Sequence, residues 1–294
     1  MKITDFKKIS SAPTHKRKFG ETYMVEHEIT GEKGVLKLIQ KEGLSETMLT
    51  RLRIESTVSF KEKGLPEILC CFENERYFSF IKRYQEGILW QKYVDLLSDK
   101  DFYRHLPKAV SQLLELLHIV HQKGFIHGDV KPSNILIRAL SPDEFQLELI
   151  DFGLCFPIGK INHAKLSFPL GYAAPELILG QLDLANETTD FYSLGITIYN
   201  LITDTIPLAH INPEIFVNLQ LTHPIPVSSK IPKSVFTLIV KMTAKAIFPL
   251  PPNRLSREKV QALLIEGIEQ RESYEVLLQE WRSLEIKKRW LKYR

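Results

Sequence analysis

The segment HGDVKPSNIL, residues 127–136, holds an acid, a base and an amide within six positions: Asp129, Lys131 and Asn134. The segment before it has apolar residues at helical spacing and stops at Gly124, as helices commonly do. The runs ILIRAL and FQLELI that follow it are typical of strands. We therefore expect a loop between a helix and a pair of strands. Asp and Asn are common in turns, so the loop alone does not specify a function.

The N-terminal part of the chain is typical of short strands with one helix. The runs ETYMVEHEIT and GVLKLIQ flank a glycine-containing turn, and YFSFIKRY is a further strand candidate. Between them we predict a helix with Ser45 as its N-cap and with Met48, Leu52 and Val58 on one face. Glu55 falls on that same face, where a carboxylate is costly unless a cation meets it. The sequence therefore predicts a cationic partner for Glu55.

Further motifs surround the loop in a definite order. Lys37 lies upstream in GVLKLI, and DFG at 151–153, GYAAPE at 171–176, DFYSLG at 190–195 and Arg254 in PPNRLS lie downstream. With this series the chain resembles the eukaryotic-type protein kinase family, whose signatures are a strand lysine, a catalytic-loop Asp and Asn, Asp-Phe-Gly and Ala-Pro-Glu.

The resemblance implies an α+β, bilobal protein-kinase-like fold. The small, mostly β N-lobe with one key helix would comprise residues 1–84, and the larger, mostly α C-lobe residues 85–270. Residues 271–294 would form an amphipathic C-terminal helical extension with a basic tail, a candidate docking element for a partner.

The implied chemistry is phosphoryl transfer, which needs the nucleophile positioned and the phosphate charge neutralised. By resemblance, Asp129 would orient the substrate hydroxyl and accept its proton, and Lys131 would steady the transferring phosphate. Asn134 and Asp151 would bind Mg²⁺. A Lys two residues after the catalytic Asp also resembles the pattern of serine/threonine kinases.

The resemblance also implies a set of ATP-binding positions in the N-terminal part. Lys37 would hold the α- and β-phosphates and would be the cation that Glu55 requires, with Glu46 as the alternative acid. The remaining positions are Gly20 in the phosphate loop and the backbone of Arg83 and Gln85 at the adenine.

Two further pairings would be architectural. Glu176 and Arg254 resemble the ion pair that anchors the activation segment. Asp190 resembles the buried acid that holds the backbone of the catalytic loop near His127.

The sequence departs from the family pattern at the catalytic loop. Gly128 replaces the arginine that often receives an activation-segment phosphate, and Ser167 and Tyr172 are the only hydroxyls of the segment LCFPIGKINHAKLSFPLGYA. We therefore expect activity independent of activation-loop phosphorylation. Pro169 replaces the threonine usual in serine/threonine kinases, which counts against that substrate class and against activity.

A second departure lies in the phosphate loop, HKRKFG. His15 and Arg17 replace the first two of three glycines, and only Gly20 remains. Bulkier residues should hold the loop away from phosphates or reshape it. Lys16, Arg17 and Lys18 are then either side-chain phosphate ligands or part of a solvated basic loop.

Three functions follow from these observations. The first is an active serine/threonine protein kinase, favoured by Lys37, Asp129, Asn134 and Asp151. The second is a pseudokinase that serves as a binding scaffold. The third is a small-molecule kinase of similar fold, which usually lacks the Ala-Pro-Glu that this chain has.

Composition limits the remaining classes. The chain has 294 residues, of which 44% are apolar and 25% charged, as in ordinary globular proteins. Its net charge of +4 is not concentrated in long runs, so we expect no nucleic-acid partner. Three scattered cysteines favour a reducing compartment. No apolar run approaches the length of a membrane span, and we expect a cytoplasmic protein. The family resemblance, not the composition, implies protein Ser/Thr hydroxyls as the acceptors.

Overall fold

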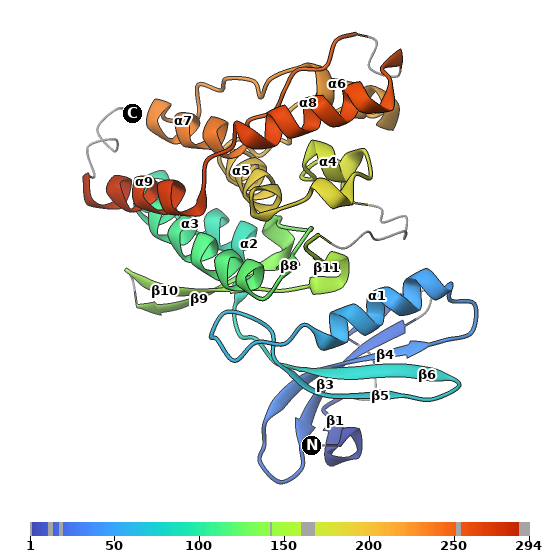
Figure 1. Ribbon diagram of the computed structural model, residues 1–294. Helices are drawn as coiled ribbons and strands as arrows, with labels where there is room; N and C mark the ends of the chain where they lie inside the picture. Colours follow the sequence, from blue (N-terminus) through green and yellow to red (C-terminus); the bar gives the residue numbers. More distant parts are fainter. Residues whose placement is uncertain are drawn as a thin grey trace. The chain divides into compact units, whose positions relative to one another are not determined.

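The computed structural model describes residues 2–10, 14–17, 20–141, 143–159, 168–250 and 254–287. The chain divides into two compact units, Met1–Gly87 with Glu148–Gly153 and Ile88–Leu147 with Leu154–Arg294 (Figure 1). The first unit carries the main sheet and one helix, and the second carries the other helices. These two units correspond to the predicted mostly β N-lobe and mostly α C-lobe. The division falls slightly beyond residue 84, and the DFG segment groups with the first unit.

An antiparallel sheet of six strands forms the first unit. Its order is β1-β3-β4-β6-β5, with β2 paired to β3. The strands are β1 (Phe6–Lys8), β2 (His15–Arg17), β3 (Gly20–His27), β4 (Lys33–Gln40), β5 (Ile68–Glu73) and β6 (Tyr77–Arg83).

The helix of the first unit, α1 (Glu46–Thr57), lies along one face of this sheet (Figure 1). It begins as predicted, because the Ser45 hydroxyl accepts a hydrogen bond from the Met48 N–H at 3.3 Å. Leu52 packs on a sheet cluster built by aromatic and aliphatic side chains, and Leu49 is buried. Met48 was expected on the inward face but is 39% exposed. The inward stripe is therefore Leu49, Leu52 and Glu55, which follow the i, i+3 spacing of one helical face.

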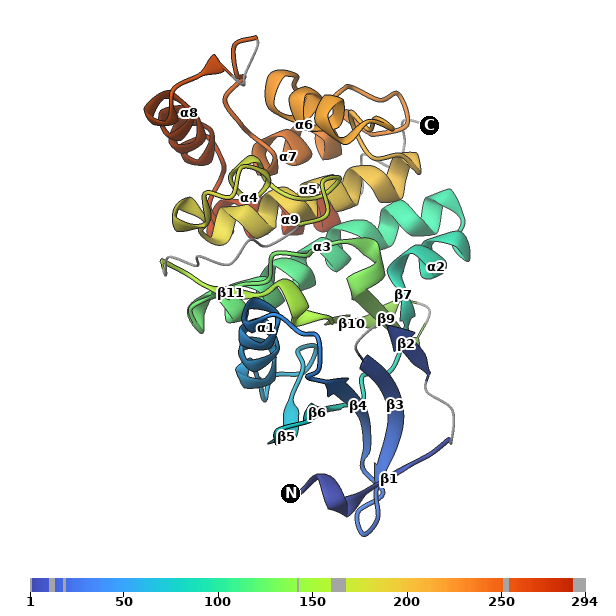
Figure 2. The ribbon, with the colours of Figure 1, turned by 90° about the vertical axis from the view of Figure 1, so that its right-hand side faces the viewer.

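Helices dominate the second unit (Figure 2). Its core helix α5 is buried nearly all round, as its apolar sequence predicts, and packs against α3 and α7. The helices are α2 (Trp90–Asp95), α3 (Asp99–Gln122), α4 (Pro175–Ile178), α5 (Glu187–Thr203), α6 (Pro213–Thr222), α7 (Lys233–Met242), α8 (Arg257–Glu269) and α9 (Tyr274–Lys287).

Short strands frame the segment that was predicted to be a loop. α3 ends just before Gly124, whose φ is +84°, and β8 (Phe125–Ile126) pairs with β11 (Phe156–Pro157). A 3₁₀ turn, Pro132–Asn134, leads into a second small sheet. That sheet contains β7 (Ile88–Leu89), β9 (Ile135–Ser141) and β10 (Glu144–Leu149), in the order β10-β9-β7. The loop is therefore fixed at both ends by strands.

The last described helix, α9, packs against α3. The ring of Tyr274 stacks on His118 with 3.9 Å between centroids, Arg282 pairs with Glu115, and Trp281 is fully buried. The amphipathic face of this helix is thus used inside the second unit. The docking of a partner on residues 271–294 stays a prediction. Among the described residues no helix has the length and apolarity needed to cross a bilayer.

Candidate active site

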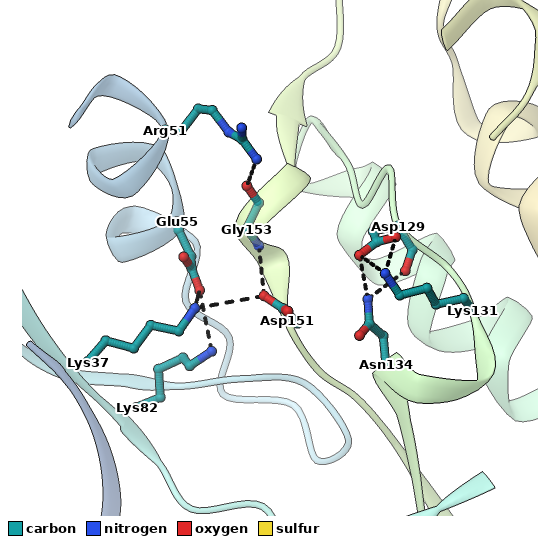
Figure 3. Close-up of polar contacts among 9 residues, drawn as sticks. All are labelled: Lys37, Arg51, Glu55, Lys82, Asp129, Lys131, Asn134, Asp151 and Gly153. Atoms are coloured by element: carbon teal, nitrogen blue, oxygen red, sulfur yellow. Dashed lines mark hydrogen bonds and ion pairs between the residues drawn. The ribbon is translucent and has the colours of Figure 1, made fainter. Parts of the chain in front are cut away.

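A partly buried ion pair joins the sheet and the helix of the first unit. Lys37 lies in the middle of β4, and its Nζ is 2.5 Å from Oε1 of Glu55 on α1 (Figure 3). The structure thus contains the pairing that the inward carboxylate requires. The alternative acid, Glu46, is 77% exposed in its side chain and pairs with Arg53 instead. Lys37 also lies 3.8 Å from Oδ1 of Asp151.

Glu55 stays charged although only 3% of its side chain is exposed. Burial alone raises the pKa of the Glu55 carboxyl, but the charges of Lys37 and Lys82 outweigh burial, and the pKa lies below its usual value. The sequence interpretation did not find Lys82, whose Nζ is 3.4 Å from the same Oε1. Two lysines therefore share one carboxylate oxygen.

The DFG segment completes this cluster within the first unit. Asp151 has φ +59°, a left-handed conformation that Asp tolerates better than most residues. Its Oδ1 accepts the Gly153 N–H at 3.4 Å, and Phe152 is buried with its ring 5.8 Å from that of Phe60. Arg51, four residues before Glu55 on α1, donates to the Gly153 carbonyl at 2.9 Å. The position of Arg51 on the Glu55 face was the only sequence signal for this contact.

In the second unit, the three residues of the loop contact one another (Figure 3). The Lys131 ammonium lies 2.8 and 2.9 Å from the two carboxylate oxygens of Asp129. The Asn134 amide nitrogen donates to the Asp129 carbonyl at 2.9 Å and to its Oδ2 at 2.7 Å. Asp129 and Asn134 are both buried. The carboxylate of Asp129 is therefore held in one orientation by an ammonium and an amide.

Helix α5 supports the backbone of this loop. Asp190 accepts the N–H groups of His127 at 2.8 Å and Gly128 at 2.9 Å, as its sequence position predicts. Thr197, two turns later on α5, donates to the Val130 carbonyl at 3.1 Å. These contacts attach the loop to the most buried helix of the unit.

Asp190 also contacts a histidine side chain that the sequence did not indicate as its partner. Nε2 of His121 on α3 lies 2.8 Å from its Oδ2. Burial raises the pKa of the Asp190 carboxyl, but the bond to His121 and the backbone N–H donors hold the pKa below its usual value.

Gly128 occupies a position where no side chain fits. Its φ is +74°, and a Cβ built there would lie 2.9 Å from the Leu154 carbonyl oxygen and 3.2 Å from the Phe168 ring. The left-handed backbone and the close approach both require glycine. The local packing therefore excludes an arginine side chain at this position.

The partner of Glu176 is Arg271, and the predicted pairing with Arg254 is wrong. Arg271 Nη1 and Nη2 lie 2.6 and 2.9 Å from the two carboxylate oxygens, and Thr189 donates to the same carboxylate at 2.8 Å. Arg254 is exposed and precedes α8, whereas Arg271 follows that helix and enters the core beside Tyr192. Burial raises the pKa of the Glu176 carboxyl, but Arg271 outweighs burial and lowers it.

The predicted adenine-contacting backbone lies at the end of β6. The Arg83 N–H donates to the Glu67 carbonyl at 2.8 Å, and the Tyr84 N–H donates to the Lys33 carbonyl at 3.0 Å. Both N–H groups are thus committed to the sheet, and Gln85 supplies the next N–H beyond it. The adenine contacts of Arg83 and Gln85 stay predictions.

Gly20 begins β3, where it pairs with Arg17 and Ile39. A Cβ there would lie 3.0 Å from the Ile39 side chain and 3.1 Å from the Leu38 carbonyl oxygen, so close packing on β4 alone accounts for this glycine. Its contact with phosphate stays a prediction. Lys18 lies outside the described residues, as do the side chains of His15, Lys16 and Arg17.

The oxygen donors of each unit suit a hard cation. Asp151 offers a carboxylate in the first unit. In the second unit, the Asn134 amide nitrogen is committed to Asp129, so its oxygen is the atom that remains for a cation. The described residues contain no group of three or more His, Cys, Asp or Glu side chains placed to hold a metal. Mg²⁺ commonly uses one or two protein oxygens together with substrate phosphates, so these residues fit Mg²⁺.

Comparison with known proteins identifies the family. The family model for the protein kinase domain matches residues 17–264. Over 199 residues, 64% of this chain and 28% of the relative, the sequence is 29% identical to maternal embryonic leucine zipper kinase of Danio rerio. It is 33% identical to serine/threonine-protein kinase TIO of Arabidopsis thaliana over 189 residues, 62% of this chain and 14% of the relative.

A third relative, serine/threonine-protein kinase D2 of Homo sapiens, is 29% identical over 199 residues, 64% of this chain and 22% of the relative. The match thus spans less than a third of each of these three proteins. The order of the motifs, the bonded loop of Asp129 and the ion pair of Lys37 with Glu55 agree with the matched domain. The chain belongs to the protein kinase family.

Proposed function

We propose that this chain is an active protein kinase that transfers phosphate from ATP to Ser or Thr hydroxyls of proteins. The observation that carries the proposal is the catalytic loop: Asp129 is buried, bonded to Lys131 and Asn134, and supported from α5 by Asp190. A loop that served only as a turn would not need an ordered acid, amide and ammonium. Three relatives named as kinases support the same activity.

Each unit supplies a different part of the reaction. In the first unit, Lys37 is the cation for the α- and β-phosphates, and Glu55 fixes its position. In the second unit, Asp129 orients the acceptor hydroxyl and takes its proton, and Lys131 steadies the transferred phosphate. Asp151 of the first unit and Asn134 of the second would each offer an oxygen to Mg²⁺, which when bound would supply neutralisation of phosphate charge.

We propose that the acceptor is Ser or Thr because Lys131 follows Asp129 by two residues. That spacing resembles serine/threonine kinases, and the names of the relatives TIO and D2 support it. Pro169 is the observation against this class, because proline has no hydroxyl to bond Asp129 and Lys131. Its carbonyl instead accepts the N–H groups of Tyr172 and Ala173 at 3.1 Å.

Activity independent of activation-segment phosphorylation is part of the proposal. The packing around Gly128 leaves no room for the arginine that would receive such a phosphate. Ser167 lies outside the described residues. We expect phosphatase-treated protein to retain the activity of untreated protein, measured as initial rates on one substrate. Activation that tracks phosphorylation of Ser167 would contradict this part of the proposal.

The test of the main proposal is phosphate transfer by the purified chain. We expect label to move from γ-labelled ATP with Mg²⁺ to a generic protein substrate, and phosphoamino-acid analysis to find it on Ser or Thr. Asp129→Asn should lower kcat by about 10²- to 10⁴-fold with nearly unchanged ATP affinity, because Asp129 acts on the hydroxyl. Label on Tyr alone would overturn the acceptor class.

A pseudokinase scaffold is the second candidate, favoured by Pro169 and by the sequence HKRKFG in place of a glycine-rich loop. The two candidates differ in nucleotide binding. If the chain binds neither adenosine nor ATP with Mg²⁺ in a calorimetric titration, the kinase proposal fails and the scaffold remains. Binding without transfer to any protein substrate would also favour the scaffold.

A further inference from the structure

Lys82 lies on the same face of the sheet as Lys37. It is the sixth residue of β6, and the pairing of Lys37 with Phe80 and of Val35 with Lys82 puts the two lysines on one face. Its Nζ is 3.4 Å from Oε1 of Glu55, the oxygen that Lys37 contacts at 2.5 Å (Figure 3). Glu55 therefore has two ammonium partners from neighbouring strands.

The burial of Lys82 has a cost that an apolar residue would avoid. Its side chain is 14% exposed, and burial lowers the pKa of its ammonium, with Lys37 lowering it further against the attraction of Glu55. The neighbouring residues Phe80 and Ile81 are apolar and buried. Glu55 keeps Lys37 as a partner without Lys82, whereas the burial of the Lys82 ammonium carries a desolvation cost. Stability alone thus gives no reason for a lysine here.

This cluster holds two ammonium groups, Lys37 and Lys82, and the positive charge of Arg51 also acts on both of its carboxylates. Glu55 and Asp151 are its carboxylates, and Lys37 contacts the first at 2.5 Å and approaches the second to 3.8 Å. A lysine that turns toward phosphate must share or lengthen its bond to Glu55. Without Lys82, that movement would leave a carboxylate that is 3% exposed with no ammonium close to it.

We propose that Lys82 is a positioning residue that keeps Glu55 charged and in place while Lys37 engages the phosphates of the nucleotide. The proposal rests on the proposed function, because it assumes that Lys37 meets ATP. Lys82 itself acts through Glu55 and need not touch the nucleotide.

The experiment compares ATP with adenosine in the full chain. In Lys82→Met, Lys37 must remain on Glu55, so we expect ATP with Mg²⁺ to bind about tenfold more weakly and adenosine to bind as in wild type. The thermal midpoint should be unchanged or higher, because a buried charge is lost. Lys82→Arg should restore most of the ATP affinity. Lys33→Met, an exposed lysine on β4, is the matched control and should change neither ligand.

A double-mutant cycle separates positioning from direct contact with phosphate. If Lys82 acts through Glu55, Lys82→Met should change ATP affinity by less than about twofold in a Glu55→Gln background. An undiminished loss in that background would overturn the proposal in favour of a direct contact.

Other outcomes distinguish this inference from the proposed function. If wild type transfers phosphate but Lys82→Met binds ATP equally well, only the role of Lys82 is overturned. An equal loss for ATP and adenosine would mean that Lys82 supports the fold, which also overturns it. If wild type binds no ATP, the proposed function fails first and the role of Lys82 fails with it.

Discussion

Glu176 and Arg271 form an ion pair whose side chains are 0% and 1% exposed. Both carboxylate oxygens are bonded to the guanidinium, and the remaining Arg271 donor Nε reaches the Ala244 carbonyl at 3.0 Å. A buried ion pair of this kind stabilises the fold little more than well-packed apolar side chains would. Loss of one partner, however, leaves the other charge buried, without a partner and without water around it. Substitution of either residue alone should therefore lower the free energy of unfolding.

We expect Arg271→Ala to lower the free energy of unfolding by about 3–5 kcal/mol, because Glu176 would stay buried and unpaired. Arg254→Ala is the matched control, since that arginine is exposed, and it should change stability by less than about 0.5 kcal/mol. Urea unfolding followed by tryptophan fluorescence measures both values. An equal effect of the two substitutions would contradict the assignment of Arg271.

A compensating variant checks the cause of the loss. Replacing both partners, as in Glu176→Leu with Arg271→Met, removes the unpaired charge along with the pair. The double variant should be more stable than Arg271→Ala in the same urea experiment. A double variant that is less stable than the single one would show that hydrogen bonding, not the stranded charge, dominates.

Two residues of helix α1, one turn apart, make polar contacts with other parts of the first unit. Glu55 forms ion pairs with two lysines of the sheet, and Arg51 donates a hydrogen bond to the Gly153 carbonyl. The helix therefore binds the sheet and the DFG segment of the first unit at once. The consequence is that its position and the backbone position of Asp151 are linked.

We expect Arg51→Ala to lower kcat/KM by about 10- to 100-fold, because a hydrogen bond from a charged donor contributes about 1.5–3 kcal/mol and orients the Asp151 segment. Arg53→Ala is the control on the same helix: Arg53 is exposed and pairs with Glu46 and Glu73 at the surface. Steady-state rates at several ATP concentrations measure both. Identical kinetics for Arg51→Ala and wild type would sink the link between α1 and the DFG segment.

Sequence patterns predicted the elements better than they predicted contacts between distant residues. The catalytic loop was predictable because Asp129, Lys131 and Asn134 lie within six consecutive residues, so their contacts depend on local sequence alone. Lys37 and Glu55 were predictable because a buried acid demands a cation. No pattern marked Lys82, since it directly precedes the exposed Arg83 at a strand end. Its burial depends on the tertiary position of the end of β6.

The error at Arg254 has a related cause. A motif such as PPNR gives the residue type but not the path of the chain after it. The helix α8 lies between Arg254 and Arg271, and only the folded path decides which guanidinium enters the core beside Glu176.

Two buried acids, Glu176 and Asp190, make the stability of the chain depend on pH. The pKa values of Glu176 and Asp190 both lie below their usual values in the folded chain. Burial raises both pKa values, but Arg271 lowers that of Glu176 and His121 lowers that of Asp190 by more. A lowered folded pKa means that the unfolded chain binds protons more readily. Their contribution is complete above about pH 4.3, the unfolded pKa of Glu, and is lost as pH falls through the folded values.

We expect the free energy of unfolding of the whole chain to fall from pH 5 to pH 3. The fall should be shallower in Glu176→Gln, which removes one of the two acids. Glu62→Gln, at an exposed loop position, should leave the slope as in wild type. Urea titrations at each pH measure the slope, and an unchanged slope in Glu176→Gln would show that other carboxyls govern acid unfolding.

The location of Arg271 also bears on where the cooperative folding unit ends. The match to the family model ends at residue 264. Glu176, in the middle of the chain, nevertheless depends on the guanidinium of Arg271, seven residues after the end of the match. Trp281, farther along the chain, is also buried. A chain cut at residue 270 should give little soluble protein with a cooperative melt, whereas one cut at residue 287 should melt like the full chain. Equal melts would contradict this. The end of the match to the family model and the end of the independently folding unit are thus different positions, and residues outside the first complete the second.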